Sequence, residues 1–168
     1  MKRIKGLSWL LVGLLALLAI LPLTPAAATE KVYHVPIEKE VEKGLLAFLE
    51  RAVSEAKENE AEAIILEIHT PGGFVDAADD IGKLIDESGI RVIAFINSKA
   101  HSAGAFIALH ADEIYMTKSA TMGAAAVIDS AGNAADEKAN SAWLAQMEAA
   151  AEKSGRDPKY ALAMANKS

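Results

Sequence analysis

Two short apolar runs constrain the fold of this 168-residue chain more than any other feature. Residues 63–68 (AIILEI) and 91–96 (RVIAFI) are rich in β-branched residues and do not alternate apolar with polar positions. Runs of this length and composition predict strands that are buried on both faces. Between them, residues 75–85 place apolar side chains at helical spacing. Strands that alternate with helices of this length pair in parallel through right-handed crossovers, so the predicted class is α/β with a parallel sheet.

The remaining segments predict further elements of the same kind. An alternating segment, residues 31–36, ends at a proline and predicts a short strand, and residues 45–56 predict an amphipathic surface helix that ends at Asn59. Residues 124–135 are mostly alanine, show no period and predict a loop. The other expected elements are a helix that starts at Ser102, a strand at 113–116, a helix at 136–153 and a last helix from Lys159.

The first 28 residues are typical of an export signal. Three basic residues within the first five positions precede an apolar run at 6–21, and small residues at 26–28 form a cleavage site after Ala28. The alternative is an uncleaved anchor, since the run is short for a full membrane span. In either case we expect one domain at 29–168, on the extracytoplasmic side of the membrane.

Composition excludes several functions. Cysteine is absent, which rules out thiol nucleophiles and cysteine-ligated metal sites. Beyond the signal, 14 basic and 23 acidic residues leave a net charge of −9, which repels nucleic acid. We expect no metal, no cofactor and no nucleic-acid partner.

Two loops leave predicted strands at the edge where parallel α/β sheets bind their ligands. Thr70-Pro71-Gly72-Gly73 is expected to end its strand sharply, and its two glycines allow backbone amides to approach a substrate. Taken alone, the segment is simply a tight turn. Ser102 stands at a helix start, where its hydroxyl is either an N-cap or a nucleophile. Amides on one loop and a hydroxyl on the next are what acyl transfer requires.

A serine nucleophile needs a base. The histidines are His34, His69, His101 and His110. His110 lies about 12 Å along the predicted helix from the serine, and no histidine follows it, which leaves lysine. Lys138 stands where the loop meets the long helix, although a solvated lysine in a charged helix start explains the same residue. A lysine base has to be buried to lose its proton near neutral pH.

The chain resembles the membrane-bound NfeD-type serine proteases, which are partners of stomatin and belong to the ClpP/crotonase superfamily. Four segments carry the resemblance: VYHVPIEKEVEKGLLAFLERA, AIILEIHTPGGFVDAA, SAGAFIALHADEIYM and TMGAAAVI. It implies a ClpP/crotonase-like βαβ spiral and a Ser–Lys dyad of Ser102 and Lys138. It also implies that the amides of Gly73 and Ala103, with Gly72 beside them, bind the oxyanion and substrate.

The expected substrate is a hydrophobic segment of a membrane protein such as stomatin, and the expected state is a membrane-associated homo-oligomer. Relative to the family, His101 replaces a small residue and could narrow the cleft, and the chain stops before the rest of the protease domain. The alternatives are a signal-peptide-peptidase-like hydrolase, a crotonase-type acyl-CoA enzyme and a membrane-microdomain scaffold without turnover. The export signal argues against the acyl-CoA enzyme.

Overall fold

The computed structural model describes residues 30–128 and 131–166, so the predicted signal at 1–28 lies outside the described residues. Strands and helices alternate along most of the chain, as the sequence predicts. The elements are β1 (Val32–Val41), α2 (Lys43–Glu58), β2 (Ala63–Gly73), α3 (Val75–Asp86), β3 (Arg91–His101), α4 (Ala103–His110), β4 (Glu113–Met116), β5 (Thr121–Gly123), α5 (Glu137–Lys153) and α6 (Pro158–Ala165).

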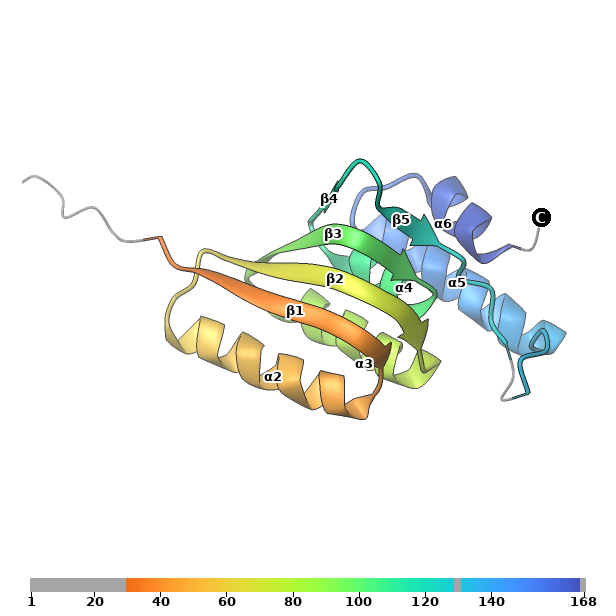
Figure 1. Cartoon of the computed structure of the whole chain (residues 1–168), viewed down its shortest axis with the longest axis horizontal. Helices are drawn as coiled ribbons and strands as arrows, with labels where there is room; N and C mark the ends of the chain where they lie inside the picture. Colours follow the sequence, from red (N-terminus) through yellow and green to blue (C-terminus); the bar gives the residue numbers. More distant parts are fainter. Residues whose placement is uncertain (1–29, 129–130, 167–168) are drawn as a thin grey trace, which may run out of the picture.

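All strand pairs of the described sheet are parallel. The order is β1-β2-β3-β4, and β5 pairs with the last residues of β3. Helices α2, α3 and α4 cover one face of the sheet, while α6 packs against β5 (Figure 1). This arrangement confirms the predicted α/β class with a parallel sheet.

Three strands, β1, β2 and β3, extend further toward the C-terminus than predicted. β1 continues past Pro36 to Val41 because it is an edge strand of the described sheet, where a missing amide costs no ladder bond. The prediction that the TPGG segment ends its strand is wrong. β2 runs on to Gly73 because Gly72 and Gly73 pair with Glu40 and Val41 of β1, after a shift in register.

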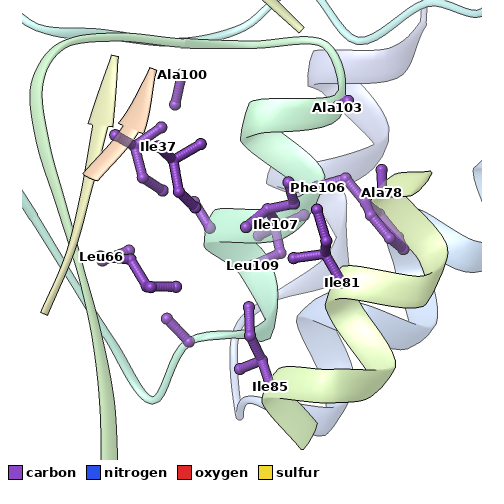
Figure 2. Close-up of a cluster of buried hydrophobic side chains, with 14 of the residues drawn as sticks. Ile37, Leu66, Ala78, Ile81, Ile85, Ala100, Ala103, Phe106, Ile107 and Leu109 are labelled. Atoms are coloured by element: carbon purple, nitrogen blue, oxygen red, sulfur yellow. The ribbon is translucent and has the colours of Figure 1, made fainter. Parts of the chain in front are cut away.

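α4 lies at the centre of the core. Its residues from Ala103 to Leu109 are all buried, so the helix is apolar on every side. Figure 2 shows α4 between the sheet and α3, with the labelled side chains of these elements pointing toward one another: Ile37, Leu66, Ile81, Ile85, Phe106, Ile107 and Leu109. Because α4 is fixed on both sides, the residue that precedes it has a fixed position as well.

The predicted loop after β5 is confirmed where it is described. Residues 124–128 and 131–136 form no helix, and one isolated bridge joins Ile128 to Ala134. In the described ranges, every helix is too short or too polar to cross a bilayer.

Candidate active site

Ser102 occupies the N-cap position of α4 but does not act as a cap. Its side chain makes no capping hydrogen bond, and its backbone has φ 51° and ψ −121°. A non-glycine residue adopts these angles at a cost of about 1–3 kcal/mol, typically where a strained turn serves a function. The strand-to-helix turn leaves the side chain half-buried rather than covered. A serine on such a turn is how α/β hydrolases expose their nucleophile.

Gly72 lies directly against this serine. A Cβ added at Gly72 would come within 2.5 Å of Ser102 Cβ and 3.1 Å of Ser102 Oγ. Gly72 also has φ 111°, which favours glycine. The TPGG segment and the serine turn therefore meet at the carboxyl ends of β2 and β3, as predicted.

Backbone amides surround the serine on two sides. The Ser102 amide donates to the Gly123 carbonyl of β5 at 2.8 Å. The Ala103 amide, in the first turn of α4, has no acceptor among the described residues. Phe74 N donates to the Val41 carbonyl at 2.9 Å, so the Gly73 amide, one residue earlier, points to the other side of the strand.

None of the four histidines hydrogen-bonds to Ser102. His34 Nε2 contacts Glu67 Oε2 at 2.5 Å, and His69 is exposed near the end of β2. His101 Nε2 bonds Thr121 Oγ1 at 2.8 Å, which ties β3 to β5. His110 lies at the far end of α4, with its Nδ1 3.0 Å from Asp86 Oδ1.

Lys138 stands in the first turn of α5, where it is exposed and has no hydrogen bond or ion pair with the described residues. Its neighbour Asp136 caps the helix by accepting from Ala139 N at 2.8 Å. Trp143, about 7.5 Å further along the axis, donates from Nε1 to the Ala125 carbonyl at 2.7 Å. α5 is therefore joined to Ala125, two residues beyond the β5 carbonyl that bonds the Ser102 amide, but no hydrogen bond joins Lys138 to the serine.

An apolar pocket opens beside β5. Its volume is about 660 Å³, and Gly123, the residue whose carbonyl bonds the Ser102 amide, is part of its wall. Three of its eight lining residues are methionines, and the lining consists of Met116, Met122, Gly123, Ala124, Tyr160, Ala163, Met164 and Asn166. Methionine side chains adapt to apolar partners of different shapes. Sequence reasoning did not single out these residues, since they are spread over three elements.

Thr70 is a further residue of this region that sequence reasoning missed. It is completely buried, and its hydroxyl accepts a hydrogen bond from Gly72 N at 3.1 Å. The signal that could have found it is a polar residue at the inward-facing position of a buried strand, next to the glycines.

A sequence profile of the family described as NfeD1b, N-terminal domain, matches residues 31–168. The chain belongs to this family. It is 54% identical to the membrane protein NfeD1b of Bacillus subtilis over 99% of its own length. It is 31% identical to the membrane-bound protease PH1510 of Pyrococcus horikoshii over 82% of its length. The chain spans 38% and 33% of these two relatives, respectively.

Solved structures similar to this NfeD1b domain include two mutants of the 1510-N membrane-bound stomatin-specific protease. A lysine-to-alanine mutant in complex with a substrate peptide superposes with a TM-score of 0.78 at 30% identity, covering 83% of this chain and 67% of the other. A serine-to-alanine mutant has a TM-score of 0.77 at 28% identity, covering 83% and 71%. ClpP1 of Listeria monocytogenes, at 17% identity and TM-score 0.66 over 80% of this chain and 79% of its own, shows the ClpP-like fold.

Proposed function

We propose that this NfeD1b domain is a serine endopeptidase in which Ser102 is the nucleophile and Lys138 the general base. The observation that carries the proposal is Ser102 itself, which stands at a helix start in a strained conformation, forms no cap, and faces Gly72. A structural serine at this position would relax into a capping geometry, which stabilises a helix by about 1 kcal/mol. The strain is therefore retained for the exposure of the hydroxyl.

The reaction follows the chemistry of acyl transfer. Lys138 accepts the proton of Ser102 Oγ as the oxygen bonds to the peptide carbonyl carbon, and the amides of Gly73 and Ala103 stabilise the resulting oxyanion. Lys138 then donates the proton to the leaving amine as the carbon–nitrogen bond breaks. Water hydrolyses the acyl-serine ester and restores Ser102.

Two observations support Lys138 as the general base: its place on α5 and the absence of a histidine bonded to Ser102. Lys138 lies on a helix that Trp143 ties to the segment following β5, and none of the four histidines bonds the serine. In the similar stomatin-specific protease, a lysine was replaced by alanine in one solved structure and a serine in another. Because Lys138 is exposed, the proposal requires that substrate or a neighbouring part of the protein bury its amine during catalysis.

The proposed substrate is a hydrophobic segment of a membrane protein, such as a stomatin homologue. The methionine-lined pocket offers an apolar surface beside Gly123, whose carbonyl bonds the Ser102 amide. The names of the relatives, a membrane protein and a membrane-bound protease, support action at the membrane. We further propose export by the N-terminal signal and assembly into a homo-oligomer.

The dyad is tested by following cleavage of a hydrophobic peptide by the wild type and by Ser102→Ala and Lys138→Ala variants. We expect both variants to lose at least about 10³-fold in kcat, as in other hydrolases that lack a member of the catalytic unit. Lys153→Ala is the matched control and should keep full activity. Lys153 lies on α5, as Lys138 does, but it pairs with Asp86 of α3. A wild-type rate in the Lys138→Ala variant would exclude Lys138 as the base.

The pocket is tested by Met164→Gln. Replacing an apolar group in a specificity pocket changes kcat/KM by about 10–200-fold, so we expect a loss in this range for peptides with a large apolar residue near the scissile bond. Val32→Thr, at an exposed position of β1, is the control and should leave kcat/KM unchanged. An equal loss for peptides with small residues would show that the pocket does not select apolar side chains.

A second candidate is a binding scaffold without turnover. The exposed, unbonded state of Lys138 favours it, since a base has to reach the nucleophile. Binding of a stomatin-like protein, with no cleavage that depends on Ser102, would establish this function in place of the peptidase.

A further inference from the structure

Two buried polar side chains stand out in the described part of the chain, Thr70 and Ser88. Both hydroxyls bond the backbone two residues further on. Ser88 lies in the turn before β3, at the opposite end of the sheet from Ser102. Thr70 lies within the TPGG segment, immediately beside the proposed site.

The Thr70 hydroxyl joins two irregular stretches of backbone. It donates to the Lys39 carbonyl and accepts from the Gly72 amide. Lys39 has φ 61° and lies in the register shift of β1, and Gly72 has φ 111°. Because the single hydroxyl proton goes to Lys39, the oxygen's lone pairs are left for Gly72. The ladder between β1 and β2 is interrupted between the Glu38–His69 and Glu40–Gly72 pairs, and the hydroxyl bridges this interruption and fixes one stretch against the other.

The methyl group of Thr70 reaches the other half of the site. A Cβ added at Gly104 would lie 2.4 Å from Thr70 Cγ2, so the methyl packs against the first turn of α4. Gly104 is two residues after Ser102. One side chain therefore contacts both the glycine segment and the helix that carries the serine.

We propose that Thr70 is a positioning residue, whose hydroxyl holds Gly72 and the Gly73 amide at the distance from Ser102 that the oxyanion requires. This inference rests on the proposed peptidase function. Thr70 does not touch the reacting atoms. Without its hydroxyl, Gly72 loses its acceptor and retains the freedom of a glycine, and a displacement of about 1 Å at a reacting centre costs about 100-fold in rate.

The test compares Thr70→Val, which removes the hydroxyl at nearly constant volume, with Thr70→Ser, which keeps it. In the full chain we expect Thr70→Val to lower kcat about 10–100-fold with KM changed less than twofold, and Thr70→Ser to restore kcat to within about threefold. Ser88→Ala is the matched control, because it removes a buried hydroxyl that likewise accepts from the amide two residues further on but makes no bond to another strand. It should lower the Tm but leave kcat unchanged.

Two results would overturn the proposal: an unchanged kcat in Thr70→Val, or equal losses of kcat in Thr70→Val and Thr70→Ser. Should Thr70→Val not fold, Thr70→Cys takes its place, since a thiol is a weak donor and acceptor, and the same losses are expected from it.

A second measurement separates this proposal from the peptidase itself. In the wild type and in Thr70→Ser, the Gly72 amide should be protected from hydrogen exchange, whereas in Thr70→Val it should exchange at least tenfold faster. Ser88→Ala should leave it protected. An unchanged Gly72 exchange rate in Thr70→Val refutes the positioning role even if no cleavage is found. Faster exchange, in a protein that shows no cleavage dependent on Ser102, supports the positioning role and refutes the peptidase.

Discussion

The backbone of Ser102 stores strain that a different residue would relieve. Glycine adopts φ 51° and ψ −121° without the steric cost of a Cβ, although it loses more entropy on folding. We predict that Ser102→Gly is more stable than the wild type by about 1 kcal/mol and has no activity. Urea unfolding measures the gain in stability, and peptide cleavage measures the loss of activity.

Ser102→Ala keeps the strain and is the control, with a stability close to that of the wild type. A Ser102→Gly variant no more stable than Ser102→Ala would show that the backbone at this position is not strained.

Gly72 should tolerate no side chain. Gly72→Ala meets both the cost of a positive φ and a clash with Ser102, so we predict a loss of stability above about 1–2 kcal/mol together with loss of activity. Gly89 has a positive φ as well, 67°, but nothing lies within 4 Å of an added Cβ. Gly89→Ala should therefore cost about 1 kcal/mol and leave activity intact. Equal effects of the two substitutions on cleavage would contradict the contact between Gly72 and the serine.

The contact between Ser102 and the TPGG segment could be predicted from residue types alone, because the two glycines and the serine hydroxyl follow successive predicted strands. The role of Thr70 could not, since its partners at Lys39 and Gly104 belong to other elements. Lys138 stays a prediction for a related reason. Whether its amine is buried depends on the loop at 124–135, a segment without a hydrophobic period.

At the scale of elements, hydrophobic patterns predicted the type of every described strand and helix except the three-residue strand β5, but not where the strands end. β2 and β3 continue into segments that are polar or rich in glycine, where pairing between backbones rather than side-chain burial maintains the strand. Such pairing depends on residues far apart in the sequence. The helices were predicted more closely because caps such as Asp136 and Asp157 are local signals.

The cap of α6 makes the apolar pocket sensitive to acid. Asp157 accepts from Lys159 N at 3.0 Å, and its pKa is lowered by the side chain of Lys159 and by that amide. A lowered pKa in the folded state contributes stability above the unfolded value of about 3.9, and that contribution is lost as pH falls. We predict that Asp157→Ala lowers the free energy of unfolding at pH 7 and has a much smaller effect at pH 3.

Urea unfolding of the wild type and of Asp157→Ala at pH 7 and at pH 3 measures how much stability the cap contributes at each pH. α6 carries Met164, whose carbonyl accepts from Ala125 N at 2.8 Å, so the variant should also weaken binding of apolar peptides. Asp79→Ala, which removes a half-buried carboxylate paired with Lys83, is the comparison. A cost of Asp157→Ala that does not change with pH would argue against the charged cap.

At the scale of the whole molecule, one buried helix links the sheet to the rest of the chain. α4 contacts β2 and β3 on one side and α3 and α5 on the other. Phe106 is at its centre, 2% exposed, with its ring 4.8 Å from that of Trp143 on α5 and 4.7 Å from that of His110. Core and site therefore depend on the same helix, since Ser102 immediately precedes it.

Truncating Phe106 should destabilise the molecule as a unit. Phe106→Ala removes a buried ring from the cluster of buried side chains that the described elements share, so we predict a loss of about 3–5 kcal/mol. Because the described elements share this core, unfolding in urea should remain a single transition, with a lower midpoint and an unchanged m-value. Phe48→Ala, at a 37% exposed position of α2, should cost far less. A second transition in Phe106→Ala would mean that α5 and α6 unfold separately from the sheet, and the nucleophile would then be held by the sheet and α3 alone.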